Sequence, residues 1–217
     1  MINKPILITG LPRSGTSLTA GCINLCGAFG GKLVPGNTQN IKGFFENMAI
    51  REPYIKEFLR KNGFCPVGVK SIPPIDYQFV EGPFRENVKE IIIKQGYKDG
   101  QWFLKDVKLK LVWTLWQQAF PEAKWVVTTR PKAAIIESCK NTSFMRTHKF
   151  TDEQWGDWHD ACYEHLLNLA KNIDVQYVST DELANGDTSQ IKGVIEKLGL
   201  SYNLKVENFI DKTLWHY

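Results

Sequence analysis

Eight consecutive residues near the start of the chain, Gly10-Leu-Pro-Arg-Ser-Gly-Thr-Ser17, have the types and spacing that bind phosphate-like anions. Small residues let backbone N–H groups converge on an anion, and a helix that follows points its N-terminus at it. The spacing resembles the loop G-x-x-x-x-G-K-[ST] of kinases and ATPases, but Thr16 replaces the lysine and Arg13 lies inside the loop. Because that lysine neutralises charge in triphosphate chemistry, its absence argues against such chemistry and against a loop-bound magnesium ion.

A second set of polar residues follows later apolar segments. Arg130 ends one such segment, and Ser138 lies eight residues further on, inside the next predicted helix. A guanidinium can clamp a phosphate with two parallel hydrogen bonds, and a hydroxyl can add a further donor. Lys105 ends another apolar segment and precedes Asp106, while Glu46 follows two aromatic residues. These side chains supply cations for an anionic ligand and carboxylates for proton transfer, and burial beside the aromatics is expected to raise the pKa of Glu46.

The segments around these residues alternate between short apolar runs and amphipathic stretches. Residues 5–9 form a continuous apolar run, which predicts a strand buried on both faces, and helix-spaced apolar residues follow from Thr16 to Gly27. Further strands are predicted at 102–104, 124–129 and 175–179. Helices are predicted at 48–61, 84–96, 108–119, 131–139 (with Pro131 in its first turn), 152–171 and 187–198, and a long ordered loop at 29–47. Strands separated by helices indicate an α/β fold of three layers, α/β/α, with a central parallel sheet of the P-loop nucleotide-binding type, in one domain over 1–217.

The loop Gly10–Ser17 resembles the donor-binding loop of the sulfotransferase superfamily, particularly the bacterial and phage-type branch that carries Pro-Arg-Ser-Gly-Thr-Ser. Further segments resemble that branch in the same order: Lys42-Gly-Phe-Phe-Glu-Asn47, Leu104-Lys-Asp-Val-Lys-Leu109, Trp125–Ser138 and Tyr177–Leu200. The resemblance spans positions 6–200. It implies an enzyme that transfers a sulfuryl group from 3′-phosphoadenosine 5′-phosphosulfate (PAPS) to a hydroxyl or amine of a small molecule or carbohydrate. The product would be adenosine 3′,5′-bisphosphate, and no metal would take part.

The resemblance also implies roles for individual residues. The 5′-phosphosulfate end of the donor is expected in the loop, at Pro12, Arg13, Ser14, Gly15, Thr16 and Ser17. Arg130 and Ser138 are expected to hold the 3′-phosphate. Arg13 occupies the position of the family's loop lysine and would act electrostatically, because arginine does not lose its proton. Lys105 resembles a second family lysine, which lies beside the sulfuryl group.

The catalytic base is where the chain departs from its small-molecule cytosolic relatives. They have a histidine two residues after the second lysine, and this chain has Val107 there. Glu46 resembles the glutamate that serves as base in other branches, although a purely structural role at the start of the helix 48–61 stays open. Asp106 is the second candidate, as a base or as a group that orients Lys105. Two other functions also stay open: a P-loop small-molecule kinase, and a catalytically inactive, sulfotransferase-like nucleotide-binding module.

The acceptor site has weaker signals. Residues 64–84 and the loop 140–151 are candidates to line it, and Trp155 and Trp158 could offer ring faces to a sugar or an aromatic acceptor. The spacing of the two tryptophans on a predicted helix favours a place in the core instead.

Composition limits the partners and the compartment. The chain of 217 residues has 27 basic and 23 acidic residues, a net charge of +4, and its lysines are interspersed with acids, which excludes a nucleic-acid-binding stripe. Its five cysteines form no CxxC pair, which argues against a zinc site, and Cys22 and Cys26 are one helical turn apart, where they are expected to pack. Residues 1–10 have no signal-peptide core, and no apolar run approaches ~20 residues. We therefore expect a soluble, cytoplasmic protein that does not interact with membranes.

Overall fold

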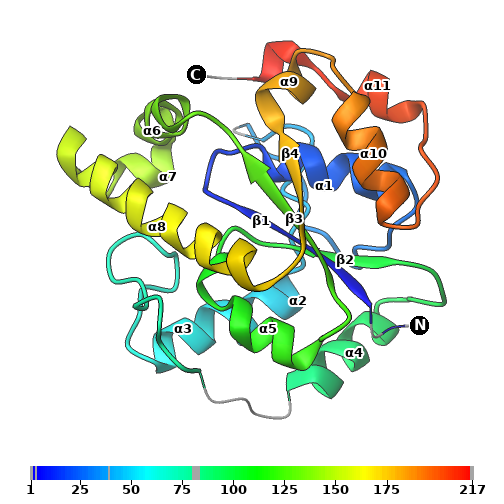
Figure 1. Ribbon diagram of the computed structural model, residues 1–217, viewed down its shortest axis with the longest axis horizontal. Coiled ribbons are helices and arrows are strands. Elements are labelled where there is room, and N and C mark those ends of the chain that lie inside the picture. The colour runs from blue at the N-terminus through cyan, green and yellow to red at the C-terminus, as the bar shows by residue number, and fades with distance from the viewer. Residues whose placement is uncertain (1, 3, 39, 80–83, 216–217) are drawn as a thin grey trace.

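A computed structural model describes residues 2, 4–38, 40–79 and 84–215 (Figure 1). At its centre is a parallel sheet, which has four strands within the described residues, in the order β2-β1-β3-β4. The strands are β1 (Pro5–Gly10), β2 (Trp102–Lys105), β3 (Lys124–Thr129) and β4 (Val175–Ser179). Leu7 on β1 pairs with Leu104 on one side and with Trp125 on the other. The parallel sheet predicted from the sequence is confirmed.

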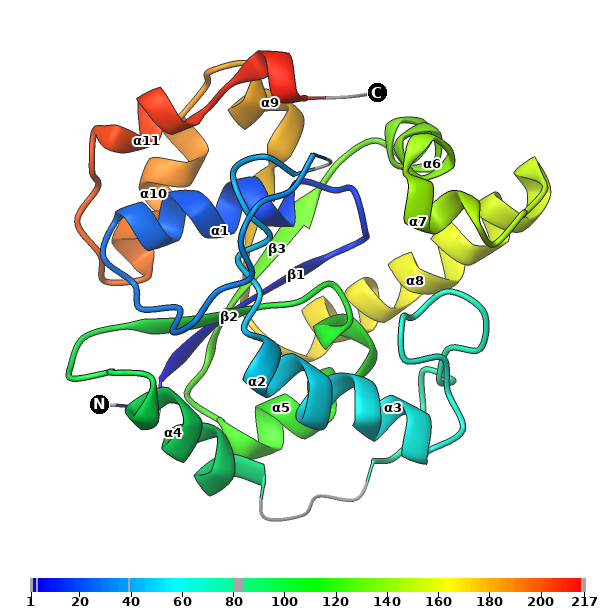
Figure 2. The same ribbon diagram turned by 180° about the vertical axis from the view of Figure 1, so that it is seen from behind.

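Helices cover both faces of the sheet. In chain order the helical segments are α1 (Thr16–Leu25), α2 (Met48–Arg51), a π-helical turn (Glu52–Lys56), α3 (Glu57–Lys61), α4 (Phe84–Lys94), a 3₁₀ turn (Leu109–Leu111), α5 (Trp113–Ala119), α6 (Lys132–Asn141), α7 (Ser143–Arg146), α8 (Asp152–Asn172), α9 (Thr180–Ala184), α10 (Ser189–Lys197), α11 (Lys205–Phe209) and a second 3₁₀ turn (Lys212–Leu214). The helices α1, α10 and α11 lie together on one face, and α4, α5 and α8 lie on the other (Figures 1 and 2).

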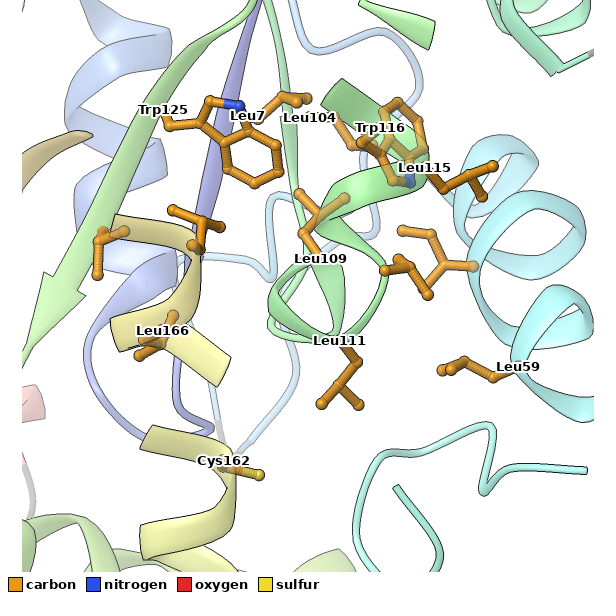
Figure 3. Close-up of a cluster of buried hydrophobic side chains, with 14 of the residues drawn as sticks. Leu7, Leu59, Leu104, Leu109, Leu111, Leu115, Trp116, Trp125, Cys162 and Leu166 are labelled. Atoms are coloured by element: carbon orange, nitrogen blue, oxygen red, sulfur yellow. The ribbon is translucent and has the colours of Figure 1, made fainter. Parts of the chain in front are cut away.

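The residues of β1 alternate between the two cores. Successive side chains of a strand point to opposite faces of its sheet. Ile6 and Ile8 therefore lie in the core beneath α1 and α10, where Cys22 packs as predicted. Leu7 lies in the opposite core with side chains from β2, β3, α5 and α8 (Figure 3). Both neighbourhoods exclude water, so an apolar run without alternation is what this strand requires, and the predicted three-layer arrangement is confirmed.

The predicted helices differ from the observed ones mainly at their boundaries. The prediction of one helix over 108–119 was wrong, because the chain makes a 3₁₀ turn and then breaks at Val112 (φ −126°, ψ 23°) before α5. Pro131 precedes α6 as its N-cap residue and does not lie in its first turn, and α10 begins at Ser189, two residues later than predicted. The short helices α7, α9 and α11 were not predicted. No helix of the described residues combines the length and the apolar character needed to cross a lipid bilayer.

Candidate functional site

A cavity of about 590 Å³ opens beyond the carboxyl ends of the strands. Open parallel sheets bind ligands at this edge, where the chain leaves one strand for neighbours on either side. Here β1 is followed in the chain by β2 on one side and then by β3 on the other. The walls of the cavity come from the loop after β1, the segment 34–46, the helical run 48–61, residues after β2, and the C-terminal segment.

The loop after β1 has the tight backbone that its glycines predict. A side chain at Gly10 would bring a Cβ within 2.1 Å of Thr128 Oγ1 on β3, so only glycine fits there. Gly15 is the N-cap of α1 with φ 80°, and Arg13 also has a positive φ of 67°. A positive φ costs free energy in a residue other than glycine, and strain of this kind concentrates at ligand-binding sites. The loop thus places the N-terminus of α1 at the cavity, which Pro12, Arg13, Gly15, Thr16 and Ser17 line.

Ser14 belongs to the support of the loop. Its hydroxyl is fully buried, donates to Leu11 O at 2.7 Å, and forms a second hydrogen bond at 2.7 Å with Thr128 Oγ1. Its side chain does not line the cavity. Among the loop residues predicted to bind the donor, the structure therefore places the Ser14 side chain behind the cavity wall.

Two arginines meet at one end of the loop. Arg13 Nε donates to Ser138 Oγ at 2.9 Å, and Arg130 Nη1 donates to Arg13 O at 3.0 Å. Both arginines line the cavity, whereas Ser138 is buried behind them. Arg130 Nε also donates to Asp181 Oδ1 at 3.2 Å, and its guanidinium carbon lies 4.3 Å from the ring centroid of Trp215. The structure brings together Arg13, Arg130 and Ser138, which are up to 125 residues apart in the sequence.

Lys105 and Glu46 meet at the other end of the loop. Lys105 Nζ donates to Glu46 Oε1 at 2.8 Å and to Phe44 O at 3.2 Å, and Ser17 Oγ donates to the same carbonyl at 3.3 Å. Arg51 Nη1 forms an ion pair with Glu46 Oε2. Both Lys105 and Glu46 are buried and line the cavity. The shared carbonyl of Phe44 therefore joins the start of α1 to the lysine and carboxylate predicted to act on the transferred group.

The expectation that burial would raise the pKa of Glu46 was wrong. Burial alone would raise it, but the charges of Lys105 and Lys108 and the hydrogen bonds from Lys105 and Arg51 outweigh burial and lower the pKa to about 2. The aromatic neighbours in the sequence gave no sign of these cations. Glu46 is therefore a carboxylate held in its ionised form by its partners.

This ionisation predicts how stability depends on pH. The lowered pKa means that Glu46 stabilises the fold fully above its ordinary value of 4.5 and that this stability is lost as the pH falls toward 2. Between those values the native protein is expected to lose about 2–3 kcal/mol more free energy of unfolding than Glu46→Gln. Urea unfolding at stepped pH measures the difference. Glu57→Gln, which removes an exposed partner of Arg60, should follow the native curve, and parallel curves for Glu46→Gln would contradict the prediction.

Asp106 lies behind the cavity wall. Its Oδ1 accepts a hydrogen bond from the backbone N–H of Lys108 at 2.8 Å and forms an ion pair with Lys108 Nζ at 2.7 Å, and its side chain is fully buried. It does not line the cavity, whereas Val107 and Lys108 do. Of the two carboxylates predicted as base, only Glu46 therefore lies at the cavity surface.

Several residues of this site were not predicted from the sequence. Arg51 and Lys108 line the cavity beside Glu46, and Asp181 and Trp215 hold Arg130. Asp181 comes two residues after the end of the predicted strand Val175–Ser179, so its place at the carboxyl edge of the sheet could have been inferred. Trp215 lies in a C-terminal segment without periodicity, and nothing local indicates that it stacks on an arginine.

The segments predicted to line an acceptor site contribute in part. Val67 comes from the range 64–84, of which residues 80–83 lie outside the described part of the chain. The loop 140–151 contributes Thr142, Phe144 and Met145. Trp155 and Trp158 lie on α8, and their side chains are buried in the core, as their spacing favoured. Among the described residues, no group of histidine, cysteine, aspartate and glutamate side chains could hold a metal ion.

Solved structures of bacterial sulfotransferases are similar to this chain. The chain is similar to the sulfotransferase STF1 of Mycobacterium tuberculosis H37Rv, with 16% identity, a TM-score of 0.58, and coverage of 97% of this chain and 71% of that one. It is also similar to the sulfotransferase domain of the Synechococcus PCC 7002 olefin synthase (13%, TM-score 0.61, 98% and 80%) and to STF9 of Mycobacterium avium (13%, TM-score 0.61, 97% and 67%). No family model and no curated protein matches the sequence. The chain therefore has the fold of the sulfotransferases, and the predicted resemblance is confirmed at that level.

Proposed function

We propose that the chain transfers a sulfuryl group from PAPS to a hydroxyl or amine acceptor. The observation that carries this proposal is the set of three cations, Arg13, Lys105 and Arg130, which line one cavity around a loop without the kinase lysine. A donor with a phosphate at each end of its ribose and a sulfate beyond one of them needs cations at separated points. The two arginines and the lysine lie on different segments and provide them.

The geometry fits such a donor at two places. The backbone N–H groups at the start of α1 have no partners inside the helix and face the cavity beside Arg13, which suits the 5′-phosphosulfate. Arg130 donates to the backbone of Arg13, its guanidinium carbon lies over the Trp215 ring, and Asp181 orients it, which suits the 3′-phosphate. Ser138 Oγ accepts a hydrogen bond from Arg13 Nε behind the cavity wall, so we assign Ser138 the role of positioning Arg13.

Sulfuryl transfer needs stabilisation of charge and removal of one proton. PAPS supplies a sulfuryl group whose bond to the 5′-phosphate oxygen breaks as the acceptor's bond to sulfur forms, and the electron pair stays on the phosphate. Arg13 and Lys105 stabilise the negative charge that develops on the 5′-phosphate as this bond breaks. Both side chains are already in place, so they need no reorganisation to do so. Glu46 lies within 2.8 Å of Lys105 Nζ and orients it.

Glu46 is also the group to which we assign the acceptor's proton. Each of its oxygens accepts a hydrogen bond from one cation and keeps capacity for another. Its low pKa makes it a weak base in the resting protein. The acceptor proton becomes more acidic as its oxygen or nitrogen bonds to sulfur, so a weak base suffices late in the transfer.

Calorimetry separates this function from its rivals. Adenosine 3′,5′-bisphosphate should bind without magnesium and in preference to ATP with magnesium. Incubation with PAPS and a panel of hydroxyl and amine acceptors, read by mass spectrometry, should yield a sulfated product. Preference for ATP with magnesium would instead support a small-molecule kinase. Nucleotide binding without transfer to any acceptor would support a catalytically inactive module.

A further inference from the structure

The part of the cavity wall around Lys105 and Glu46 carries cations beyond those assigned to the donor. The cationic side chains that line this wall are Arg51, Lys56, Lys105 and Lys108. Glu46 lines it too, but the other carboxylates that pair with these cations, Glu52 and Asp106, do not. Asp106 is buried behind the wall with the Lys108 ammonium against it, and Glu52 is 41% exposed outside the cavity, so Arg51 and Lys56 are the cations of this wall that stay available to a ligand. The donor's own charges are assigned to Arg13, Arg130, Lys105 and the start of α1.

An alternating chain of charges connects this wall to the proposed site of transfer. Lys105 Nζ is 2.8 Å from Glu46 Oε1, and Glu46 pairs with Arg51. Arg51 Nη2 is 2.7 Å from Glu52 Oε1, which is also 3.0 Å from Lys56 Nζ. The side chains of Arg51 and Lys56 are 16% and 22% exposed, so their charges are only partly screened by water. Both keep N–H groups that these pairs do not use.

The backbone of this segment is shaped to present both cations. Arg51 and Lys56 are five residues apart, and a regular α-helix would turn them about 140° away from each other. The π-helical turn Glu52–Lys56, which contains Pro53, bonds residues five apart and so brings them toward one face. Such turns cost stability within a helix and occur frequently at functional sites. The turn is thus a second, independent sign that this wall binds a ligand.

Apolar side chains also line the cavity. They are Val67, Val107, Phe144 and Met145. Phe144 is 51% exposed at the mouth, where its ring would be covered by a bound molecule. A molecule that contacts these side chains and the cations of the wall therefore presents both apolar surface and negative charge.

Resting on the function proposed above, we propose that the acceptor is a molecule with an apolar body and an anionic group, a carboxylate or a phosphate monoester, which Arg51 and Lys56 bind. The apolar body lies against Val67, Val107, Phe144 and Met145. The hydroxyl or amine that receives the sulfuryl group then lies toward Lys105 and Glu46. The wall thereby selects anionic acceptors over neutral ones of the same shape.

The test compares matched probes by calorimetry on the full chain saturated with adenosine 3′,5′-bisphosphate. The probes are 3-(4-hydroxyphenyl)propanoate, its methyl ester, and 2-(4-hydroxyphenyl)ethyl phosphate. At least one anion should bind about tenfold or more tightly than the ester. Lys56→Gln should weaken that anion about tenfold and change the affinity of the ester less than twofold. The tighter of the two anions identifies the preferred group.

A control variant and a second set of titrations without nucleotide distinguish failure of this inference from failure of the proposed function. Lys94→Gln removes a lysine from an equivalent i,i+4 pair with Glu90 on α4, outside the cavity, and should leave all three affinities unchanged. Equal affinity for anions and ester, no binding of either anion, or no effect of Lys56→Gln would each overturn the inference. The same titrations without nucleotide measure the affinity of the probes for this wall independently of donor binding. Failure to bind adenosine 3′,5′-bisphosphate would therefore count against the proposed function alone.

Discussion

Replacing Lys105 by methionine is expected to lower kcat for sulfuryl transfer by about 10²–10³-fold while the affinity for adenosine 3′,5′-bisphosphate changes little. Methionine keeps the length and apolar stem of lysine and removes only the charge. The charge matters most when negative charge develops on the oxygen between the sulfuryl group and the 5′-phosphate, and removing one preorganised donor from a site of this kind typically costs that much in rate. The bisphosphate lacks the sulfuryl group, so its binding does not need Lys105.

Steady-state kinetics with PAPS and calorimetry with adenosine 3′,5′-bisphosphate measure the two effects separately. Lys124→Met is the matched control, because Lys124 also extends from a strand and donates to backbone carbonyls, those of Lys197 and Leu198, away from the cavity. Glu46 keeps Arg51 as a partner in this variant, and a thermal melt excludes unfolding caused by the loss of its second partner. An equal loss in both quantities would assign Lys105 to donor binding, and unchanged kcat would remove it from the mechanism.

The sequence predicts the framework of this site because its parts are encoded locally. The apolar run before Gly10 predicts β1, and the two glycines predict the turn into α1, since the closeness of Thr128 Oγ1 admits no side chain at Gly10. The long helix α8 is encoded by its own pattern too. Thr151 and Gln154 cap it reciprocally, and its apolar residues repeat with helical spacing.

The electrostatics of the site could not be predicted in this way. Glu46 and Lys105 are 59 residues apart, and Arg130 and Asp181 are 51 apart, so no local pattern reports either pair. The predicted direction of the Glu46 pKa shift was wrong for this reason. The two aromatic neighbours indicated burial, whereas Lys105 and Lys108, whose charges lower the pKa, come from another segment. Helices shorter than two turns, such as α7 and α9, also lack enough residues to show a period.

The π-helical turn Glu52–Lys56 could not be predicted from helical periodicity. Residues 48–61 were predicted as one helix, and the chain is helical throughout, but Glu52–Lys56 form a π-turn. A 3.6-residue pattern places Arg51 and Lys56 on different faces. The altered turn brings both side chains toward the cavity that they line, and the proposed binding of an anionic acceptor uses both.

Arg130→Met is expected to remove most of the preference for adenosine 3′,5′-bisphosphate over adenosine 5′-monophosphate, a loss of about 100-fold in the ratio of the two affinities. The two nucleotides differ only in the 3′-phosphate, so their ratio isolates the contact that Arg130 would make with it. Arginine binds phosphate through two parallel hydrogen bonds, which lysine does not reproduce. Arg130→Lys should therefore keep part of the preference and Arg130→Met nearly none.

The surroundings of Arg130 determine how this experiment is controlled. Its removal leaves Asp181 with the Trp215 indole N–H as a remaining partner and uncovers the Trp215 ring, so some loss of stability is expected and must be measured by thermal melting. The ratio is insensitive to such a loss, because both nucleotides bind the same folded protein. Arg60→Met removes an exposed arginine of α3 and should leave the ratio unchanged. A ratio unaffected by Arg130→Met would place the 3′-phosphate elsewhere and would leave Arg130 as a structural support for the loop at Arg13.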